Sequence, residues 1–100
     1  MRIVINKSFG GFSVSEDFCK HYNIPYKNLS GYINPIGGIE RTDERLIEYI
    51  DTYGSKAASG KCSLLVVMEV PKGCLYMIDE YDGCENLYCK DLENWKIAEY

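Results

Sequence analysis

The sequence is poor in the residues that catalytic and metal sites use most. It contains one histidine, His21, and no Cys-x-x-Cys pair, so a zinc site is disfavoured. Its five cysteines are odd in number, which argues against a disulfide scaffold and predicts reduced thiols. Cys62 and Cys74 stand in apolar runs and are expected to act as small core residues. We expect no metal and no cofactor.

Long apolar runs and an excess of basic residues are also missing. No segment approaches the roughly 20 apolar residues that span a bilayer, and Ile3-Val4-Ile5 is too short for the apolar region of a signal peptide. We therefore expect a soluble, intracellular protein with no membrane partner. The formal net charge is −4 and no basic stripe is visible, so nucleic acid is disfavoured as a partner because binding it depends on neutralising phosphates.

What is present is typical of a small globular protein. Hydrophobic residues make up 46% of the 100 residues and charged residues 26%, which predicts one folded domain over residues 1–100. A strand is expected at 3–5, and a helix follows with Ser15 as its cap. Asn23 and Pro25 end that helix. Residues 26–40 are predicted to form a long loop with at most one short strand.

The second half contains clearer periodicity. Asp43 or Thr42 caps a helix with an apolar stripe, and Gly54 stands at its C-terminal end. The stripe consists of Leu46, Ile47, Ile50 and Tyr53.

The rest of the second half is predicted to be mainly strand. A β-branched run over 62–70 is expected to form the central strand of the sheet, joined by a hairpin to a partner strand at 75–80. A fourth short strand is expected at 87–89, and 91–95 fits either a turn or a frayed helix. The pattern predicts an α+β fold, a small mainly antiparallel sheet with two helices packed on one face.

A glycine-rich loop between the first strand and the first helix is the best candidate for a binding site. Adjacent glycines permit close approach to the main chain, and a helix start offers unpaired N–H groups that favour an anion. The alternative is a tight connection with both phenylalanines in the core. The predicted ligand contacts in this loop are Asn6, Lys7, Phe9, Gly10, Gly11, Phe12, Ser13 and Ser15.

Two further positions complete the predicted site. Arg41 is suited to a bidentate contact with a phosphate or carboxylate, although an exposed pair with Asp43 or Glu44 would explain it equally. The acidic and aromatic stretch Glu80-Tyr81-Asp82 could bind ribose hydroxyls or stack on a base. The alternative there is a turn in which Asp82 bonds to nearby backbone and Glu80 faces water.

Three stretches resemble a family of small phage and prophage proteins. Its members open on an I-N-x-x-x-G-G-F-x-x-S pattern, matched here over 5–15. They continue with an arginine and an aspartate before an R-L helix, as in 41–46, and with an I-x-E-Y-D-G turn, as in 78–83. The resemblance spans most of the chain. The tail from Cys84 onward departs from the acidic, tryptophan-containing ends of the family.

The resemblance implies a phage origin and an accessory protein that acts on the host. Compact phage proteins of this size include sponges that sequester nucleotide-derived messengers of bacterial immunity, such as the ADP-ribose conjugates of Thoeris defence. By analogy, we expect this chain to sequester such a messenger, an ADP-ribose conjugate or a cyclic nucleotide, in the host cytoplasm. Its small core and aromatic-rich composition favour a homodimer.

Catalysis has little support in the sequence. A hydrolase or transferase would need a nucleophile with a base, a metal cluster or paired carboxylates. Asp79, Glu80 and Asp82 could be posed as an acid/base set, but adjacent strand residues point to opposite faces. We therefore expect a binding protein and not an enzyme. The alternative function is an inhibitor that binds a host protein directly through an aromatic and acidic surface.

Overall fold

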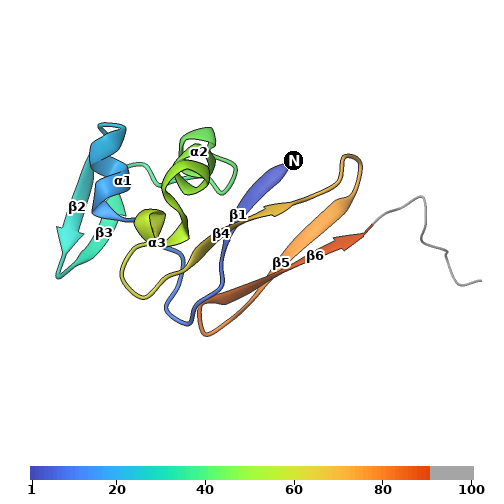
Figure 1. Ribbon diagram of the computed structural model, residues 1–100. Coiled ribbons are helices and arrows are strands. Elements are labelled where there is room, and N and C mark those ends of the chain that lie inside the picture. The colour runs from blue at the N-terminus through green and yellow to red at the C-terminus, as the bar shows by residue number, and fades with distance from the viewer. Residues whose placement is uncertain (91–100) are drawn as a thin grey trace, which may run out of the picture.

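The chain folds into small antiparallel sheets with helices packed beside them (Figure 1). A computed structural model describes residues 1–90, so the turn or frayed helix expected over 91–95 lies outside the described residues. The α+β class is confirmed. The elements within residues 1–90 are β1 (Arg2–Asn6), α1 (Glu16–His21), β2 (Tyr26–Leu29), β3 (Tyr32–Pro35), α2 (Glu44–Tyr53), α3 (Ser55–Ala58), β4 (Leu65–Glu69), β5 (Leu75–Tyr81) and β6 (Cys84–Lys90).

The strands pair in three separate antiparallel ladders, β1 with β4, β2 with β3 and β5 with β6. The predicted hairpin between the 62–70 and 75–80 segments is therefore wrong, and β4 is not a central strand, because β1 is its one hydrogen-bonded neighbour in the described sheets. The reason lies in the next turn along the chain. Asp82 and Gly83 both have positive φ, 49° and 87°, which matches the two-residue hairpin turn that pairs β5 with β6.

Residues 26–35 form a β-hairpin and 36–40 the loop after it, so the prediction of a long loop with at most one short strand over 26–40 is wrong. β2 and β3 pair from Tyr26 opposite Pro35 to Leu29 opposite Tyr32. Ser30 and Gly31 connect them with positive φ values of 56° and 91°, again the geometry of a two-residue hairpin turn. The Asn28 side chain stabilises this turn, since its Oδ1 accepts the Gly31 N–H at 2.8 Å.

The helices bury one face of the β1–β4 pair. Ser15 caps α1 and Asp43 caps α2, each accepting a backbone N–H within its first turn, and Gly54 follows α2 with φ 92°. Tyr53 was predicted in the apolar stripe but is 54% exposed, because the last turn of α2 runs past the core. The buried cluster on this side consists of Val4, Val14, Phe18, Cys19, Ile24, Leu46, Tyr49, Ile50, Ala58 and Leu65.

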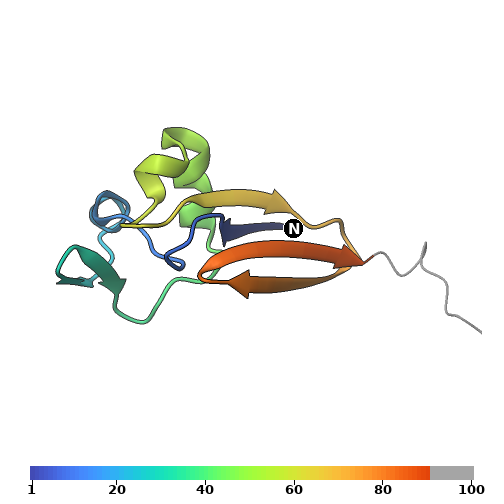
Figure 2. The same cartoon turned by 90° about the horizontal axis from the view of Figure 1, so that it is seen from below.

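The β5–β6 hairpin covers the opposite face of the β1–β4 pair. Side chains alternate along a strand, so Ile3 and Ile5 point away from Val4, and both are buried outside the cluster beneath the helices. Ile3 shares a groove with Tyr76 and Ile78 of β5. Seen from below, the β1–β4 pair lies between the helices and the hairpin (Figure 2). The molecule thus has a helical side and a hairpin side.

Candidate functional site

The glycine loop packs against the protein's own backbone. A Cβ on Gly10 would lie 2.3 Å from the carbonyl oxygen of Cys62, and a Cβ on Gly83 would lie 2.3 Å from the Gly11 nitrogen. Cys62 lies in the loop between α3 and β4 and is exposed, with φ 65°, so its prediction as a core residue is wrong, whereas Cys74 is half-buried. The three loops are so close together that a side chain at Gly10 or Gly83 would not fit.

Asn6 ties these loops together from a fully buried position. Its Nδ2 donates to the carbonyl oxygens of Ser8 and Gly83, each at 2.8 Å. Its Oδ1 accepts the N–H of Leu64 at 2.8 Å and of Ser8 at 3.2 Å. These four bonds match the two donors and two lone pairs of an amide side chain. A ligand could bond to the Asn6 side chain only by displacing one of them.

Arg41 makes a bidentate contact, and its carboxylate partner is Glu85. Arg41 Nη1 donates to Glu85 Oε1 at 2.7 Å, and Nη2 donates to Oε2. Glu85 Oε1 also accepts the Asn6 backbone N–H at 2.7 Å. The predicted geometry at Arg41 is thus present, while the proposed alternative pairing with Asp43 or Glu44 is wrong, since Asp43 pairs with Arg45 at 2.8 Å.

The Arg41–Glu85 pair closes the edge of β1 that does not face β4. The Val4 N–H donates to the Arg41 carbonyl oxygen at 2.8 Å, and Arg41 Nη1 donates back to the Val4 carbonyl oxygen at 3.3 Å. With the Asn6 N–H bound to Glu85, these backbone groups of the edge are satisfied by the Arg41 carbonyl and by the side chains of Arg41 and Glu85 instead of another strand. The Arg41 guanidinium lies over the ring of Phe12, and its central carbon is 4.7 Å from the centre of that ring.

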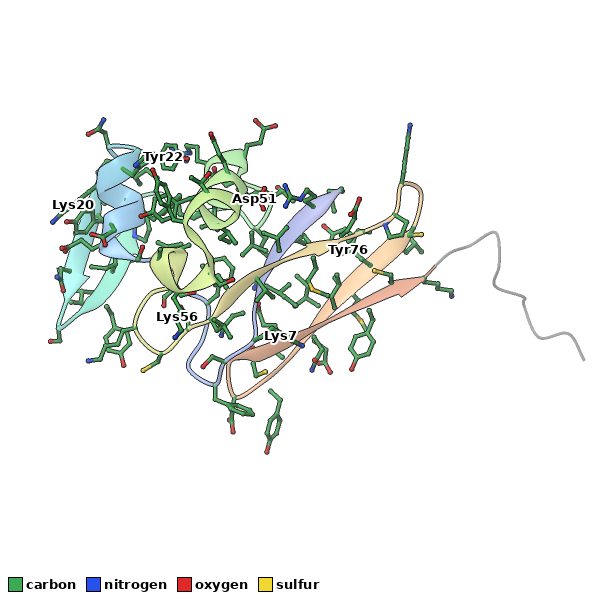
Figure 3. The ribbon with its side chains drawn as sticks, viewed as in Figure 1. Lys7, Lys20, Tyr22, Asp51, Lys56 and Tyr76 are labelled. Carbon is green, nitrogen blue, oxygen red and sulfur yellow. The ribbon has the colours of Figure 1, made fainter. Side chains whose placement is uncertain are left out.

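Lys7 adds a further contact to the hairpin. Its Nζ donates to Asn86 Oδ1 at 2.9 Å and to the Glu85 carbonyl oxygen at 3.2 Å, and Figure 3 shows it beside β6. Lys7 and Arg41 therefore both bind residues of β6. The contacts that sequence reasoning assigned to a ligand anion are made within the protein, and ligand binding by these residues stays a prediction.

The remaining loop residues have separate surroundings. Phe9 is 67% exposed, so the alternative with both phenylalanines in the core is wrong for Phe9. Ser15 Oγ accepts the Phe18 N–H at 3.1 Å and donates to the Ala57 carbonyl oxygen at 2.6 Å. Ser13 Oγ lies 3.4 Å from the Lys61 carbonyl oxygen. The start of α1 is therefore occupied by Ser15, together with the acidic first turn of that helix.

The Glu80-Tyr81-Asp82 stretch forms the turn end of the β5–β6 hairpin. Glu80 Oε1 accepts the Gly83 N–H at 3.0 Å, and Tyr81 is 74% exposed. Because Gly83 packs on Gly10 and Gly11, this turn lies next to the glycine loop. The two segments are therefore close enough to contact one ligand, as the sequence prediction requires. Glu85, which joins Arg41 to Asn6, was missed. The sequence contained one indirect signal: a two-residue turn at Asp82-Gly83 predicts a hairpin in which Glu85 lies opposite Glu80.

An open groove lies beside Arg41, on the side away from the glycine loop. Its volume is about 430 Å³, and its walls include Gly37, Gly38, Glu40, Arg41 and Tyr76. Gly37 and Gly38 have φ of 88° and 76°, and a Cβ on either would meet nothing within 4 Å. Tyr76 is 45% exposed and lies on the side of β5 that faces β4 (Figure 3). The groove thus combines a cation, a carboxylate and an aromatic ring.

Two observations on the described residues bear on thiol and metal chemistry. Burial raises the pKa of the Cys19 thiol, so Cys19 is held in the protonated form that is a poor nucleophile. Within residues 1–90, no group of three or more His, Cys, Asp or Glu side chains could hold a metal ion. In the same range, every helix is too short or too polar to cross a membrane.

Comparison with known proteins leaves the identity of the family open. No family model, no curated protein and no solved structure matches the chain. The resemblance to small phage proteins therefore remains a prediction from the three motifs.

Proposed function

We propose that the protein is a phage anti-defence protein that binds and sequesters a nucleotide-derived immune messenger in the host cytoplasm without altering it. The observation that carries this proposal is the groove beside Arg41. Its volume of about 430 Å³ lies within the range of pockets that hold small ligands, roughly 300–1,000 Å³. We therefore propose that the ligand binds in this groove and not in the glycine loop.

The groove walls suit the three parts of a nucleotide. Tyr76 offers a ring face for a base, and Glu40 offers acceptors for ribose hydroxyls. Arg41 has five N–H donors, of which three are used in its bonds to Glu85 and Val4, so donors remain for a phosphate or pyrophosphate. Gly37 and Gly38 allow the ligand to approach their backbone closely. These groups favour holding a ligand over transforming it.

Calorimetry and thermal-shift measurements with ADP-ribose, its conjugates and cyclic nucleotides test the proposal. We expect saturable binding, and Tyr76→Ala should weaken it about 5- to 150-fold, because stacking on one base contributes about 1–3 kcal/mol. Tyr53→Ala is the matched control, since it removes another exposed tyrosine that lies on α2. Ligand recovered after denaturation should have an unchanged mass. Absence of binding to the whole panel would refute capture.

A second variant separates the groove from the glycine loop. A Cβ on Gly11 would meet nothing within 4 Å, but the φ of 88° strains any side chain there, so Gly11→Trp places a large ring on the loop and circular dichroism must first show that the variant keeps its fold. We expect binding to survive this change if the ligand lies in the groove. Loss of binding in Gly11→Trp, with Tyr76→Ala unaffected, would assign the ligand to the loop instead.

A second function is favoured by a surface on the helical side. The exposed rings of His21 and Tyr53 and the half-buried ring of Tyr22 are joined through the buried ring of Tyr49, with centres 4.6 Å apart for His21–Tyr22 and 4.7 Å apart for Tyr49–Tyr53. Glu48 lies 3.5 Å from the Tyr22 hydroxyl, and Figure 3 shows Tyr22 between α1 and α2. We propose this aromatic and acidic surface as the place where an inhibitor of a host protein would dock. Recovery of a stoichiometric host protein that is lost in Tyr53→Ala and kept in Tyr76→Ala would support it.

A further inference from the structure

The Arg41 guanidinium has one pair of parallel N–H donors in use and a second pair open. The end-on pair, one hydrogen each from Nη1 and Nη2, binds both carboxylate oxygens of Glu85, and the other Nη1 hydrogen is donated to the Val4 carbonyl oxygen at 3.3 Å. Of the five donors, Nε–H and the second Nη2 hydrogen remain. These two lie parallel on one side of the planar group, so they form a second fork that fits two oxygens of one oxyanion.

The open fork is accessible to solvent. Within residues 1–90, no buried side-chain nitrogen or oxygen lacks a hydrogen-bond partner, and the bonds of the Arg41 side chain in that range all come from Nη1 and Nη2. Arg41 Nε is therefore not buried, in agreement with a side chain that is 33% exposed. Arg41 is a wall of the groove, and Glu85 and the ring of Phe12 hold its guanidinium in place. An oxyanion in the groove would meet donors that are already oriented.

The charges around this fork limit how negative the bound anion can be. Arg41 forms an ion pair with Glu85, whose side chain is 7% exposed, so the Glu85 charge is weakly screened by salt. Glu40 is an exposed wall residue of the groove and has no ion-pair partner within residues 1–90. Glu40 and Arg41 are the charged residues among the groove walls. With Glu85 behind Arg41, the site holds two carboxylates and one guanidinium, and its net charge is negative.

We propose that the groove selects phosphodiesters and pyrophosphates, which carry one negative charge on each phosphorus, over ligands that end in a phosphomonoester. This selectivity rests on the proposed function and narrows its ligand class. One charge shared by two oxygens fills the open fork. A second charge on the same phosphate would be attracted by Arg41 but repelled by Glu85 and Glu40. It would gain little attraction, while its removal from water would cost more.

AMP and its methyl ester are the matched probes, because the ester blocks the second ionisation of the phosphate and leaves the rest of the molecule unchanged. We expect calorimetry at about pH 8 to show several-fold tighter binding of the ester. AMP binding should strengthen as the pH falls through about 6, where its dianion takes up a proton, and binding of the ester should change little. If both probes are too small to bind, ADP and ADP-ribose make the same comparison, since the added ribose esterifies the terminal phosphate of ADP.

Glu40→Gln tests the charge of the groove directly. It keeps an acceptor oxygen and removes one carboxylate, so it should tighten binding of the phosphomonoester several-fold more than binding of the ester. Glu44→Gln is the matched control. Glu44 is also exposed and lies at the start of α2, outside the groove walls, so this change should leave the preference as it is. Circular dichroism of both variants checks that the fold is retained.

The possible results separate the selectivity from capture itself. A phosphomonoester that binds as tightly as its ester at about pH 8 would overturn the selectivity and leave capture in place. The same conclusion would follow if Glu40→Gln changed both affinities equally. If the esters, ADP-ribose and cyclic AMP all fail to bind, capture and the selectivity that rests on it are both wrong.

Discussion

Glu85 is the residue that fixes the β5–β6 hairpin to β1. Its carboxylate accepts hydrogen bonds from the Asn6 backbone N–H and from Nη1 and Nη2 of Arg41, and Glu85 is only 5% exposed. Glu85→Ala would leave a partly buried cation and a buried N–H without their partner. We expect a loss of about 3 kcal/mol in the free energy of unfolding, measured by urea denaturation at neutral pH.

Rescue by small carboxylates makes the Glu85 prediction specific. Formate or acetate is small enough to occupy the position of the deleted carboxylate, so either should restore part of the stability of Glu85→Ala. Glu80→Ala is the control, because Glu80 is exposed and accepts one N–H, and its loss should be about 1 kcal/mol or less with no rescue. A Glu85→Ala protein as stable as the unaltered chain would contradict the role given to this residue.

At the residue scale, sequence reasoning singled out residues that lie together in the structure, where they have partners within the protein, and ligand binding by them stays a prediction. Asn6, Lys7, Arg41 and the glycines do gather in one region, and Arg41 does make a bidentate carboxylate contact. The partner is Glu85, which is 44 residues from Arg41 and 79 from Asn6 along the chain. No local pattern encodes a pairing at that separation. An internal carboxylate and a ligand phosphate demand the same chemistry from an arginine.

At the element scale, the features set by local chemistry were predictable. Ser15, Asp43 and Gly54 stand where helix ends require them, because capping depends on residues within one turn. Strand partners were less predictable. The choice between pairing β4 with β5 or with β1 depends on burial of β1 on both of its faces, with Val4 on one and Ile3 and Ile5 on the other. The Ser30-Gly31 turn was a readable local signal for the β2–β3 hairpin that the prediction passed over.

The cap of α2 should make part of the stability depend on pH. Arg45 holds the pKa of the Asp43 carboxyl below its ordinary value of 3.8 through side-chain and backbone hydrogen bonds. A carboxyl whose pKa is lower in the folded state than in the unfolded state stabilises the fold at pH values above its unfolded-state pKa. That stabilisation is lost as the pH falls through the folded-state pKa. Asp43→Asn keeps a capping oxygen and removes the charge. It should be less stable by up to about 1 kcal/mol at pH 7.

Urea denaturation at a series of pH values checks this prediction. The difference in unfolding free energy between the unaltered chain and Asp43→Asn should shrink as the pH falls below 3.8. Asp43→Ala, which removes both the charge and the capping oxygen, should remain less stable than Asp43→Asn throughout. A constant difference between the unaltered chain and Asp43→Asn at all pH values would show that the charge of Asp43 contributes nothing.

At the scale of the whole molecule, the two sides of the β1–β4 pair are held by different interactions. The helical side is a cluster of apolar side chains around Phe18 and Leu46. The hairpin side buries Ile3 and Ile5 of β1 and adds polar contacts from Asn6, Lys7 and Arg41. Polar contacts of this kind are specific in direction, and each one contributes little net free energy in water. The hairpin should therefore separate from β1 more readily than the helices do.

Hydrogen exchange can measure this difference in the intact chain. Amides of β5 and β6 should exchange through openings of lower free energy than those of α1 and α2, since local opening follows the weakest set of contacts. Glu85→Ala should accelerate exchange at the hairpin and at the Asn6 amide, whose acceptor is removed, and leave the helical amides protected relative to global unfolding. Equal acceleration at both sides would instead mean that hairpin and helices open as one cooperative unit, so that the polar contacts at Glu85 hold the whole fold and not the hairpin alone.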